Sequence, residues 1–289
     1  MLFANVSFAQ AELYTSTTEF TETFKYKSKN SIEINAERAD IFVTGSDIEE
    51  IQVKSIVTSK NSSRSEAKAD LSKMQVLVEK LGKTVYLRNY ISVKDLDQKP
   101  NSNLKVVFEI KVPRACPINI KNSFGDIMIT NLNTTIDIDS KYTKIDLSYL
   151  EGTGNVTSVL GDVNMHSSYG EYAFNLSRCD IVLENSDGVF NIESKYGKVT
   201  ATVNPELEKL VVLGETVDVN LNMENLSSSY YNLSSKGGKI IVDQNFNTVP
   251  ETKEKGDVIL LELNKDIDCS RLNIDTQFGT ISLKKPSKQ

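Results

Sequence analysis

Carboxylates are the most numerous side chains in this sequence that could do chemistry. The chain has 39 acidic residues, and the pairs Gly125-Asp126 and Gly161-Asp162 match the calcium-binding nonapeptide of parallel β-helices in part. Calcium takes about six to eight oxygen ligands, so acidic residues must recur in successive turns. The row after each glycine position instead reads Asp126, Thr135, Lys144, Thr153, Asp162, Glu171, Asp180, Val189 and Lys198. Because lysines in this row would repel a cation, we predict structural corners and no metal site.

Two aspartates could supply the chemistry of glycoside hydrolysis, which needs paired carboxylates roughly 5–10 Å apart in a groove. Asp162 and Asp180 are eighteen residues apart, so stacked corners would bring them together. Such an enzyme also needs long loops that build a cleft, and the short repeat described below leaves no room for them. The lone histidine, His166, is accompanied by no Gly-x-Ser-x-Gly motif. We therefore predict a solvated acidic face, no catalytic residues and no cofactor.

Tyrosines are the side chains best suited to binding. Tyr142, Tyr169 and Tyr196, with Tyr149 as a further candidate, recur near the corners of the repeat. An exposed aromatic strip could stack on sugar rings or anchor a protein partner, because tyrosine combines a large apolar ring with a polar hydroxyl. The alternative is a purely structural ladder packed inside the corners.

An internal repeat predicts the elements that position these side chains. Two positions, two residues apart, stay almost wholly apolar through successive nine-residue steps. The first reads Ile127, Ile136, Ile145, Gly154, Val163, Tyr172, Ile181, Phe190 and Val199; the second reads Ile129, Ile138, Leu147, Val156, Met165, Phe174, Leu183, Ile192 and Ala201. A separation of two puts both side chains on one face of a strand, whereas a helix needs spacings of about three and four. Each unit is therefore predicted to be one short strand with one buried face.

A row of glycines predicts the corners between these strands, because glycine tolerates positive φ and close backbone approach. Two residues before the first apolar position, the sequence reads Gly125, Thr134, Thr143, Gly152, Gly161, Gly170, Cys179, Gly188 and Gly197. Such regularity is typical of a solenoid, whose turns stack on one another. Phe124, Tyr142, Leu160 and Tyr196 recur at eighteens, with Arg178 breaking the row. This spacing favours two units per coil; a coil of 27 residues is the alternative.

The predicted fold class is all-β: a single-stranded β-solenoid, or β-helix, of nine-residue strand-turn units with one short helix near the N-terminal end. Longer alternating strands are predicted at 76–80, 83–91 and 104–112, and a capping helix at 64–74. We divide the chain into 1–11, a residual signal-peptide segment, 12–115, a β-rich part with the capping helix, and 116–289, the solenoid. The last two segments are expected to form one continuous domain.

Composition argues for a folded protein and against a nucleic-acid partner. Hydrophobic residues make up 39% of the chain and charged residues 25%, and the net charge is −6. Phosphate binding needs a basic surface instead. Cys116, Cys179 and Cys269 lie far apart and form no metal-binding motif. We expect buried free thiols; one disulfide with one thiol left over is the alternative.

The N-terminal residues indicate export. Residues 1–11 read MLFANVSFAQA, and Ala9-Gln10-Ala11 fits the small-x-small pattern that signal peptidase cleaves. A frayed N-terminal strand is the alternative. No other stretch approaches the roughly 18 apolar residues that span a bilayer. We expect an exported protein without a membrane span that is periplasmic, at the cell surface or secreted.

The residues at the start of the repeat carry a resemblance to a known family. Val112-Pro113, Ile118-Asn119-Ile120 and the run from Ser123 to Ile127, followed by repeated Tyr-Gly-x units, resemble a bacterial "putative adhesin" family. That family has a domain of unknown function with a β-solenoid fold, similar to the auto-transporter adhesin head domain. The resemblance implies export and brings no accepted catalytic residues.

The sequence thus predicts a non-enzymatic, exported β-solenoid that acts as an adhesin or cell-envelope interaction protein. Its expected partner is a surface glycan or a protein, bound through many weak contacts along the repeated strands. The alternative is a carbohydrate-active β-helix enzyme, a polysaccharide lyase or hydrolase. A purely structural envelope component is a third possibility.

Overall fold

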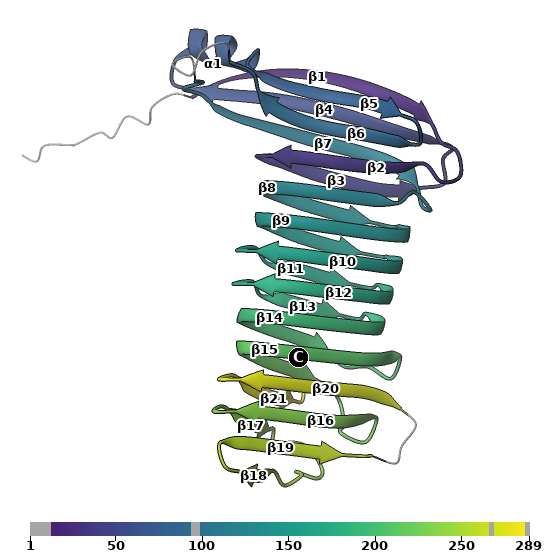
Figure 1. Ribbon diagram of the computed structural model, residues 1–289, viewed down its shortest axis with the longest axis vertical. Helices are drawn as coiled ribbons and strands as arrows, with labels where there is room; N and C mark the ends of the chain where they lie inside the picture. The colour runs from purple at the N-terminus through teal and green to yellow at the C-terminus, as the bar shows by residue number, and fades with distance from the viewer. Residues whose placement is uncertain (1–12, 94–98, 266–268, 287–289) are drawn as a thin grey trace, which may run out of the picture.

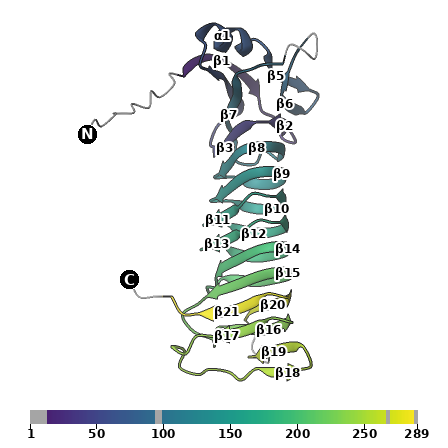
Figure 2. The ribbon, with the colours of Figure 1, turned by 90° about the vertical axis from the view of Figure 1, so that its left-hand side faces the viewer.

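The chain forms an elongated column of stacked β-coils, with a broader group of strands at the N-terminal end (Figures 1 and 2). The computed structural model describes residues 13–93, 99–265 and 269–286. The predicted signal-peptide segment 1–11 lies outside these residues. Within them the only helix is α1, Arg64–Leu71, and every other regular element is a strand. The predicted all-β, solenoid-like class with one short helix is confirmed.

Seven strands build the N-terminal end. They are β1 (Tyr14–Lys25), β2 (Ser31–Glu37), β3 (Ala39–Ser46), β4 (Glu50–Asn61), β5 (Met74–Leu81), β6 (Thr84–Ile91) and β7 (Asn103–Pro113). β2 and β3 form the first coil and pair in parallel with β8 (Ile118–Thr130). Beyond this coil, β6 and β5 extend one side of the column and β7, β4 and β1 extend the other. Strands from both predicted segments, 12–115 and 116–289, therefore share one hydrogen-bonded sheet.

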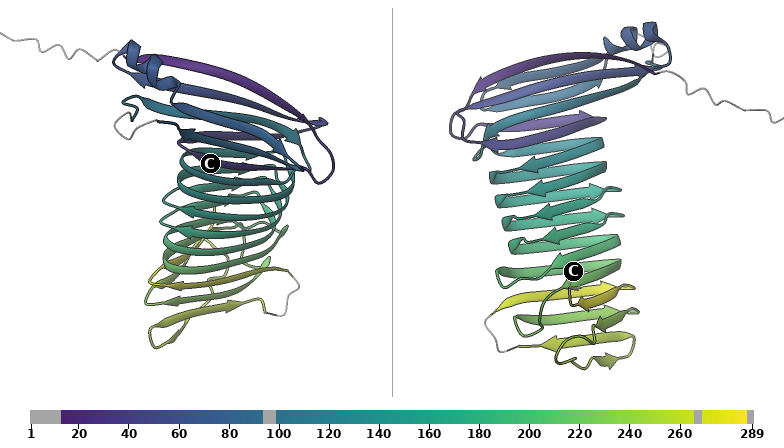
Figure 3. Two further views of the ribbon diagram at one scale, coloured as in Figure 1. Left: turned by 45° about the horizontal axis from the view of Figure 1, so that its top comes forward. Right: turned by 180° about the vertical axis from the view of Figure 1, so that it is seen from behind.

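Helix α1 packs against β1 and β4 at this end (Figure 3). Ser63 caps it, since its side chain accepts a hydrogen bond from the backbone N–H of Glu66. The buried Asp70 carboxylate accepts the N–H groups of Asn101 and Ser102, both at 2.9 Å. These bonds attach the helix to the segment that leads into β7. The helix ends three residues before its predicted end, because Met74 begins β5.

The regular part of the column runs through seven further strands. They are β9 (Asn133–Ser148), β10 (Glu151–Val159), β11 (Val163–His166), β12 (Tyr169–Ser177), β13 (Ile181–Glu184), β14 (Asp187–Thr202) and β15 (Leu207–Asn222). Parallel pairing relates residues eighteen apart: Ile127 faces Ile145, which faces Val163. Each coil from β8 to β14 therefore contains eighteen residues, and the 27-residue alternative is wrong for this region. The step from β14 to β15 is longer, because Phe190 pairs with Leu210 and Val199 with Val219.

Each coil has two strand segments on opposite sides (Figure 3), and their inward side chains form one apolar core. The row that begins at Ile127 and the row that begins at Ile136 are buried almost completely. Side chains at equivalent places lie over one another, and the polar residues between them point outward. The core therefore continues along the column, and each added coil extends it.

Two edges join the two sides of each coil. The first edge consists of residues 124, 142, 160, 178 and 196, and the second of residues 131, 149, 167 and 185. All of these residues are non-glycine and have φ between 47° and 65°. Of the predicted corner glycines, Gly125, Gly161 and Gly197 directly follow the first edge, whereas Gly152, Gly170 and Gly188 lie three residues after the second edge and have φ between 102° and 141°. A Cβ on Gly161 would lie 2.0 Å from the carbonyl oxygen of Thr143, so close approach of neighbouring coils requires glycine there.

The C-terminal strands do not follow chain order. They are β16 (Ser229–Lys236), β17 (Lys239–Val242), β18 (Lys253–Lys255), β19 (Val258–Leu263), β20 (Ser270–Gln277) and β21 (Thr280–Lys284). β20 lies between β15 and β16, and β21 lies between β15 and β17 (Figure 1). Beyond β16, β19 pairs antiparallel with β16. The short strand β18 pairs antiparallel with β19 and ends that side of the column. The last coil is thus inserted between two coils that precede it in sequence.

The cysteines contribute to packing. Cys116 and Cys179 are buried free thiols, as expected from small apolar side chains. Burial raises the pKa of Cys116 to about 12, so this thiol stays protonated. Cys269 is partly exposed and directly precedes β20.

Candidate binding surface

The aspartates in the row beside the first edge accept hydrogen bonds from backbone N–H groups of the next coil. Asp162 and Asp180 lie in adjacent coils, as predicted, but the Oδ1 atom of Asp162 accepts the N–H of Asp180 at 3.0 Å. Asp180 repeats this contact with the N–H of Lys198 at 2.9 Å. Lys144 occupies the row one coil before Asp162 and is paired with Asp146 at 2.9 Å. These carboxylates therefore satisfy corner N–H groups, which is a structural role.

No group of three acidic, histidine or cysteine side chains in the described residues is arranged to hold a metal ion. His166, for which no catalytic role is predicted, is exposed at the second edge. Its ring meets Tyr149 edge-on, with the ring centroids 5.8 Å apart.

The predicted tyrosine strip is divided between two edges. Tyr142 and Tyr196 lie on the first edge, separated by Leu160 and Arg178, and Tyr169 lies beside the second edge. All three side chains are about half exposed, so the interpretation that they pack inside the corners is wrong. The structure brings Tyr169 close to Tyr149 instead, since both line the same hollow.

At the first edge of the column, aromatic rings stack face to face, so they expose their rims to solvent more than their faces. Phe124 and Tyr142 stack with centroids 4.9 Å apart and ring planes 1° apart. One face of Tyr142 is thus covered by Phe124, and register places Leu160 on its other side. This ladder supports bulky residues in left-handed backbone, a conformation that costs roughly 1–2 kcal/mol per residue. The Phe124–Tyr142 stack occupies one face of each ring, which a sugar would otherwise need.

The second edge is hollowed between successive coils. A depression of about 460 Å³ is lined by Arg114, Asn131, Leu132, Asn133, Tyr149, Leu150, Glu151, Ser167, Ser168, Tyr169, Asn185 and Asp187. Tyr149 is 60% exposed and Tyr169 55%. Register places Tyr169 between Glu151 and Asp187, and the Tyr149 ring has His166 as an edge-on neighbour. About half of each tyrosine side chain is therefore accessible to a ligand, with amide and carboxylate groups nearby.

The polar groups of this hollow are held in place by hydrogen bonds. The Nδ2 atom of Asn133 donates to Glu151 at 3.0 Å, and that of Asn131 donates to the Gly45 carbonyl at 2.8 Å. Asp187 accepts the Nδ2 amide of Asn204 at 2.8 Å. A site with fixed polar groups and exposed rings loses little side-chain entropy when a ligand binds.

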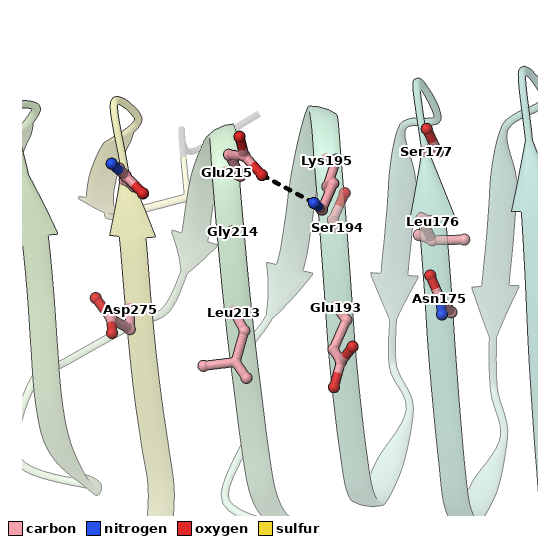
Figure 4. A pocket seen from close by; sticks show the side chains of 11 residues that line it. Asn175, Leu176, Ser177, Glu193, Ser194, Lys195, Leu213, Gly214, Glu215 and Asp275 are labelled. Atoms are coloured by element: carbon pink, nitrogen blue, oxygen red, sulfur yellow. Dashed lines mark ion pairs between the residues drawn. The ribbon is translucent and has the colours of Figure 1, made fainter.

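A second depression lies on the outer face of β12, β14, β15 and β20 (Figure 4). It measures about 410 Å³ and is lined by Asn175, Leu176, Ser177, Glu193, Ser194, Lys195, Leu213, Gly214, Glu215, Asp275 and Gln277. Lys195 pairs with Glu215 at 3.0 Å, whereas Leu213 lies between Glu193 and Asp275 (Figure 4). Sequence reasoning missed this groove, because β20 reaches β15 only through the inserted coil. We call it the outer-face groove.

The fold and these surfaces define a β-solenoid with long exposed faces and edges. A family model described as Toastrack DUF4097 matches residues 29–284, and the chain belongs to this family. No curated protein sequence matches the chain.

Solved structures with similar folds come from bacteria. A "putative adhesin" from Bacteroides fragilis has 15% identity and a TM-score of 0.51, covering 92% of this chain and 97% of its own. A "putative cell adhesion protein" from Clostridium sporogenes has 16% identity and a TM-score of 0.32, covering 94% and 100%. A "putative adhesin" from Parabacteroides distasonis has 11% identity and a TM-score of 0.41, covering 92% and 97%. The first likeness supports the fold, and the resemblance seen in the sequence is confirmed.

Proposed function

We propose that the protein is a non-enzymatic, exported module of the bacterial cell envelope that binds a surface glycan at its second edge. In this proposal the column is built from nine-residue strand-turn units, two per coil, which present equivalent groups at regular intervals. The observation that carries the proposal is the hollow with two exposed tyrosine side chains, Tyr149 and Tyr169, among fixed amide and carboxylate groups.

The chemistry of the hollow suits a carbohydrate. Apolar ring faces can cover the C–H side of a sugar, while Asn131, Asn133 and Asn185 can exchange hydrogen bonds with its hydroxyls. The hollow is elongated across several coils, so a polymer would make several weak contacts and no single deep one. An adhesive role needs this kind of contact.

A glycan-binding assay with the purified full-length chain tests the proposal. Tyr149→Ala and Tyr169→Ala should each weaken binding about tenfold, the loss expected for a central aromatic contact. Tyr142→Ala and Tyr196→Ala are matched controls, because they remove exposed tyrosines from the opposite edge. Equal losses in both pairs, or no binding by the parent chain, would contradict the assignment.

The export component needs a separate measurement. Fractionation of cells that express the full-length gene should place the protein in the periplasm, at the cell surface or in the medium. Recovery in the cytoplasm would contradict export and leave the binding result unaffected. In the described residues, no helix has the length and apolar character needed to cross a membrane.

One observation favours the competing enzyme. Register places Tyr169 between Glu151 and Asp187, so the backbones of these two acidic residues lie two strand spacings apart, about 10 Å. Each already accepts a side-chain amide N–H, so one acceptor position of each carboxylate is used in holding the structure together. Release of new reducing ends or unsaturated sugars from the bound glycan, abolished by Glu151→Gln, would establish the enzyme instead.

A further inference from the structure

The outer-face groove combines an apolar floor with unpaired acidic walls. Leu213 is 49% exposed at its centre, on a face whose other residues in the same row are polar. That row reads Lys121, Asp139, Thr157, Asn175, Glu193, Leu213 and Asp275. A single exposed leucine is ordinary. Its position between two carboxylates in a depression is what indicates a ligand.

The charges of the groove are not balanced by its own residues. Glu215 is paired with Lys195, but among the described residues neither Glu193 nor Asp275 takes part in an ion pair. Ser194 also lines the groove, is only 3% exposed, and its Oγ has no hydrogen-bond partner in the described part. A neutral ligand would desolvate both carboxylates without compensation, whereas a cation would pair with them.

The separation of Glu193 and Asp275 indicates which kind of cation could contact both carboxylates. Glu193 and Asp275 flank Leu213 across two strand spacings, about 10 Å between backbones. A guanidinium group carries five N–H donors in a rigid plane and can therefore meet acceptors on two sides. The aliphatic part of an arginine side chain can lie on Leu213 while its head reaches the carboxylates. A compact ammonium group can contact one carboxylate well, but not both.

We infer that the outer-face groove binds an arginine side chain of a protein partner, with its aliphatic part on Leu213 and its guanidinium between Glu193 and Asp275 (Figure 4). This site is distinct from the hollow at the second edge and does not depend on glycan binding there. It gives the column a second specificity, for an arginine-bearing peptide segment.

Fluorescence polarisation with a labelled (Gly-Arg)4 peptide and the full chain tests the inference. The peptide should bind at least tenfold more tightly than (Gly-Lys)4 and should not bind measurably as (Gly-Gln)4. Affinity should fall as salt increases, because exposed charges are screened. The Glu193→Gln/Asp275→Asn double variant should lose at least tenfold in affinity, and Leu213→Ser a smaller but measurable factor.

The matched control is Asp139→Asn/Glu171→Gln, which removes the same two charges from the same face outside the groove. An equal loss in this control would show attraction to net charge alone and overturn the inference. Equal affinity for the arginine and lysine peptides would also overturn it. Sedimentation of the unlabelled chain completes the test: self-association abolished by the groove variant would assign the groove to a second copy.

Discussion

Gly154 lies directly over the ring of Tyr172 in the next coil, and a Cβ on Gly154 would approach the ring's Cδ1 atom to 2.7 Å. Both residues belong to the same inward row, where most coils supply an isoleucine, leucine or phenylalanine. Because Gly154 has no side chain, the large ring of Tyr172 in the next coil fits against it. Tyr172 also stacks on Phe190 on its other side, at 6.1 Å between centroids.

This pairing predicts that Gly154→Ala destabilises the fold by about 1–3 kcal/mol, as overpacking a core does. Tyr172→Leu in the same chain should recover part of the loss, since the smaller side chain frees space. Urea denaturation of both single variants and the double variant measures the coupling. Additive effects would contradict the contact.

Removing only the hydroxyl group of Tyr172 should have a different effect on stability. It is buried without a hydrogen-bond partner in the described residues, so Tyr172→Phe removes a polar group that the fold does not satisfy. We expect stability to be unchanged or raised by up to about 1 kcal/mol. A clear loss of stability in equilibrium denaturation would reveal a partner for this hydroxyl.

Alkaline pH should destabilise the protein through two buried tyrosines. Burial raises the pKa of Tyr172 and of Tyr231 to about 12, from the ordinary tyrosine value of 10.0. The folded chain then holds protons that the unfolded chain releases, so stability is full below pH 10 and falls as pH rises toward 12. Each group contributes about 1.4 kcal/mol per pH unit in this window. Denaturation at several pH values should show a shallower decline in Tyr172→Phe.

The close approach at Gly161 predicts a large effect of any side chain there. Gly161→Val places a branched side chain against the Thr143 carbonyl, and we expect a loss above about 3 kcal/mol or failure to fold. Gly170→Val should behave alike, because its Cβ would lie 1.9 Å from the Gly152 carbonyl oxygen. Glu171→Val, at an exposed neighbouring position, is the control. Unchanged thermal melting of both glycine variants would contradict the coil spacing.

Thr216 offers a stabilising substitution. It continues the first edge in left-handed backbone with φ 56°, which is unfavourable for a β-branched residue. The second edge uses asparagine in this conformation, at Asn131 and Asn185. We therefore expect Thr216→Asn to stabilise the chain by roughly 0.5–1 kcal/mol. Thr200→Asn, in a strand, should destabilise it, and thermal melting distinguishes the two.

The sequence predicts the regular part of the fold because one core runs through it. The two apolar rows from Ile127 and Ile129 have constant spacing, so the buried face and the eighteen-residue coil follow from local pattern. The glycine row placed the corners correctly, and the positive φ that glycine tolerates is found at Gly152, Gly170 and Gly188. The pattern did not predict that bulky residues such as Phe124 and Tyr142 have positive φ as well.

The candidate sites depend on contacts that the pattern does not contain. Periodicity alone does not divide Tyr142 and Tyr169 between two edges, because that requires knowing where each coil turns. The outer-face groove is further out of reach, since Asp275 joins Glu193 and Leu213 only when β20 inserts beside β15. Long-range strand order leaves no trace in local hydrophobic spacing.

The inserted coil also determines when the molecule can be completed. During synthesis, coils from β2–β3 to β15 can stack in the order in which they leave the ribosome. The strands β16 and β17 then have no parallel partner until residues 270–284 have emerged, because β20 and β21 separate them from β15. A nascent chain interrupted before its last strands would hold a finished upper column and an unattached lower end. Completion of the column therefore requires that synthesis has passed residue 284.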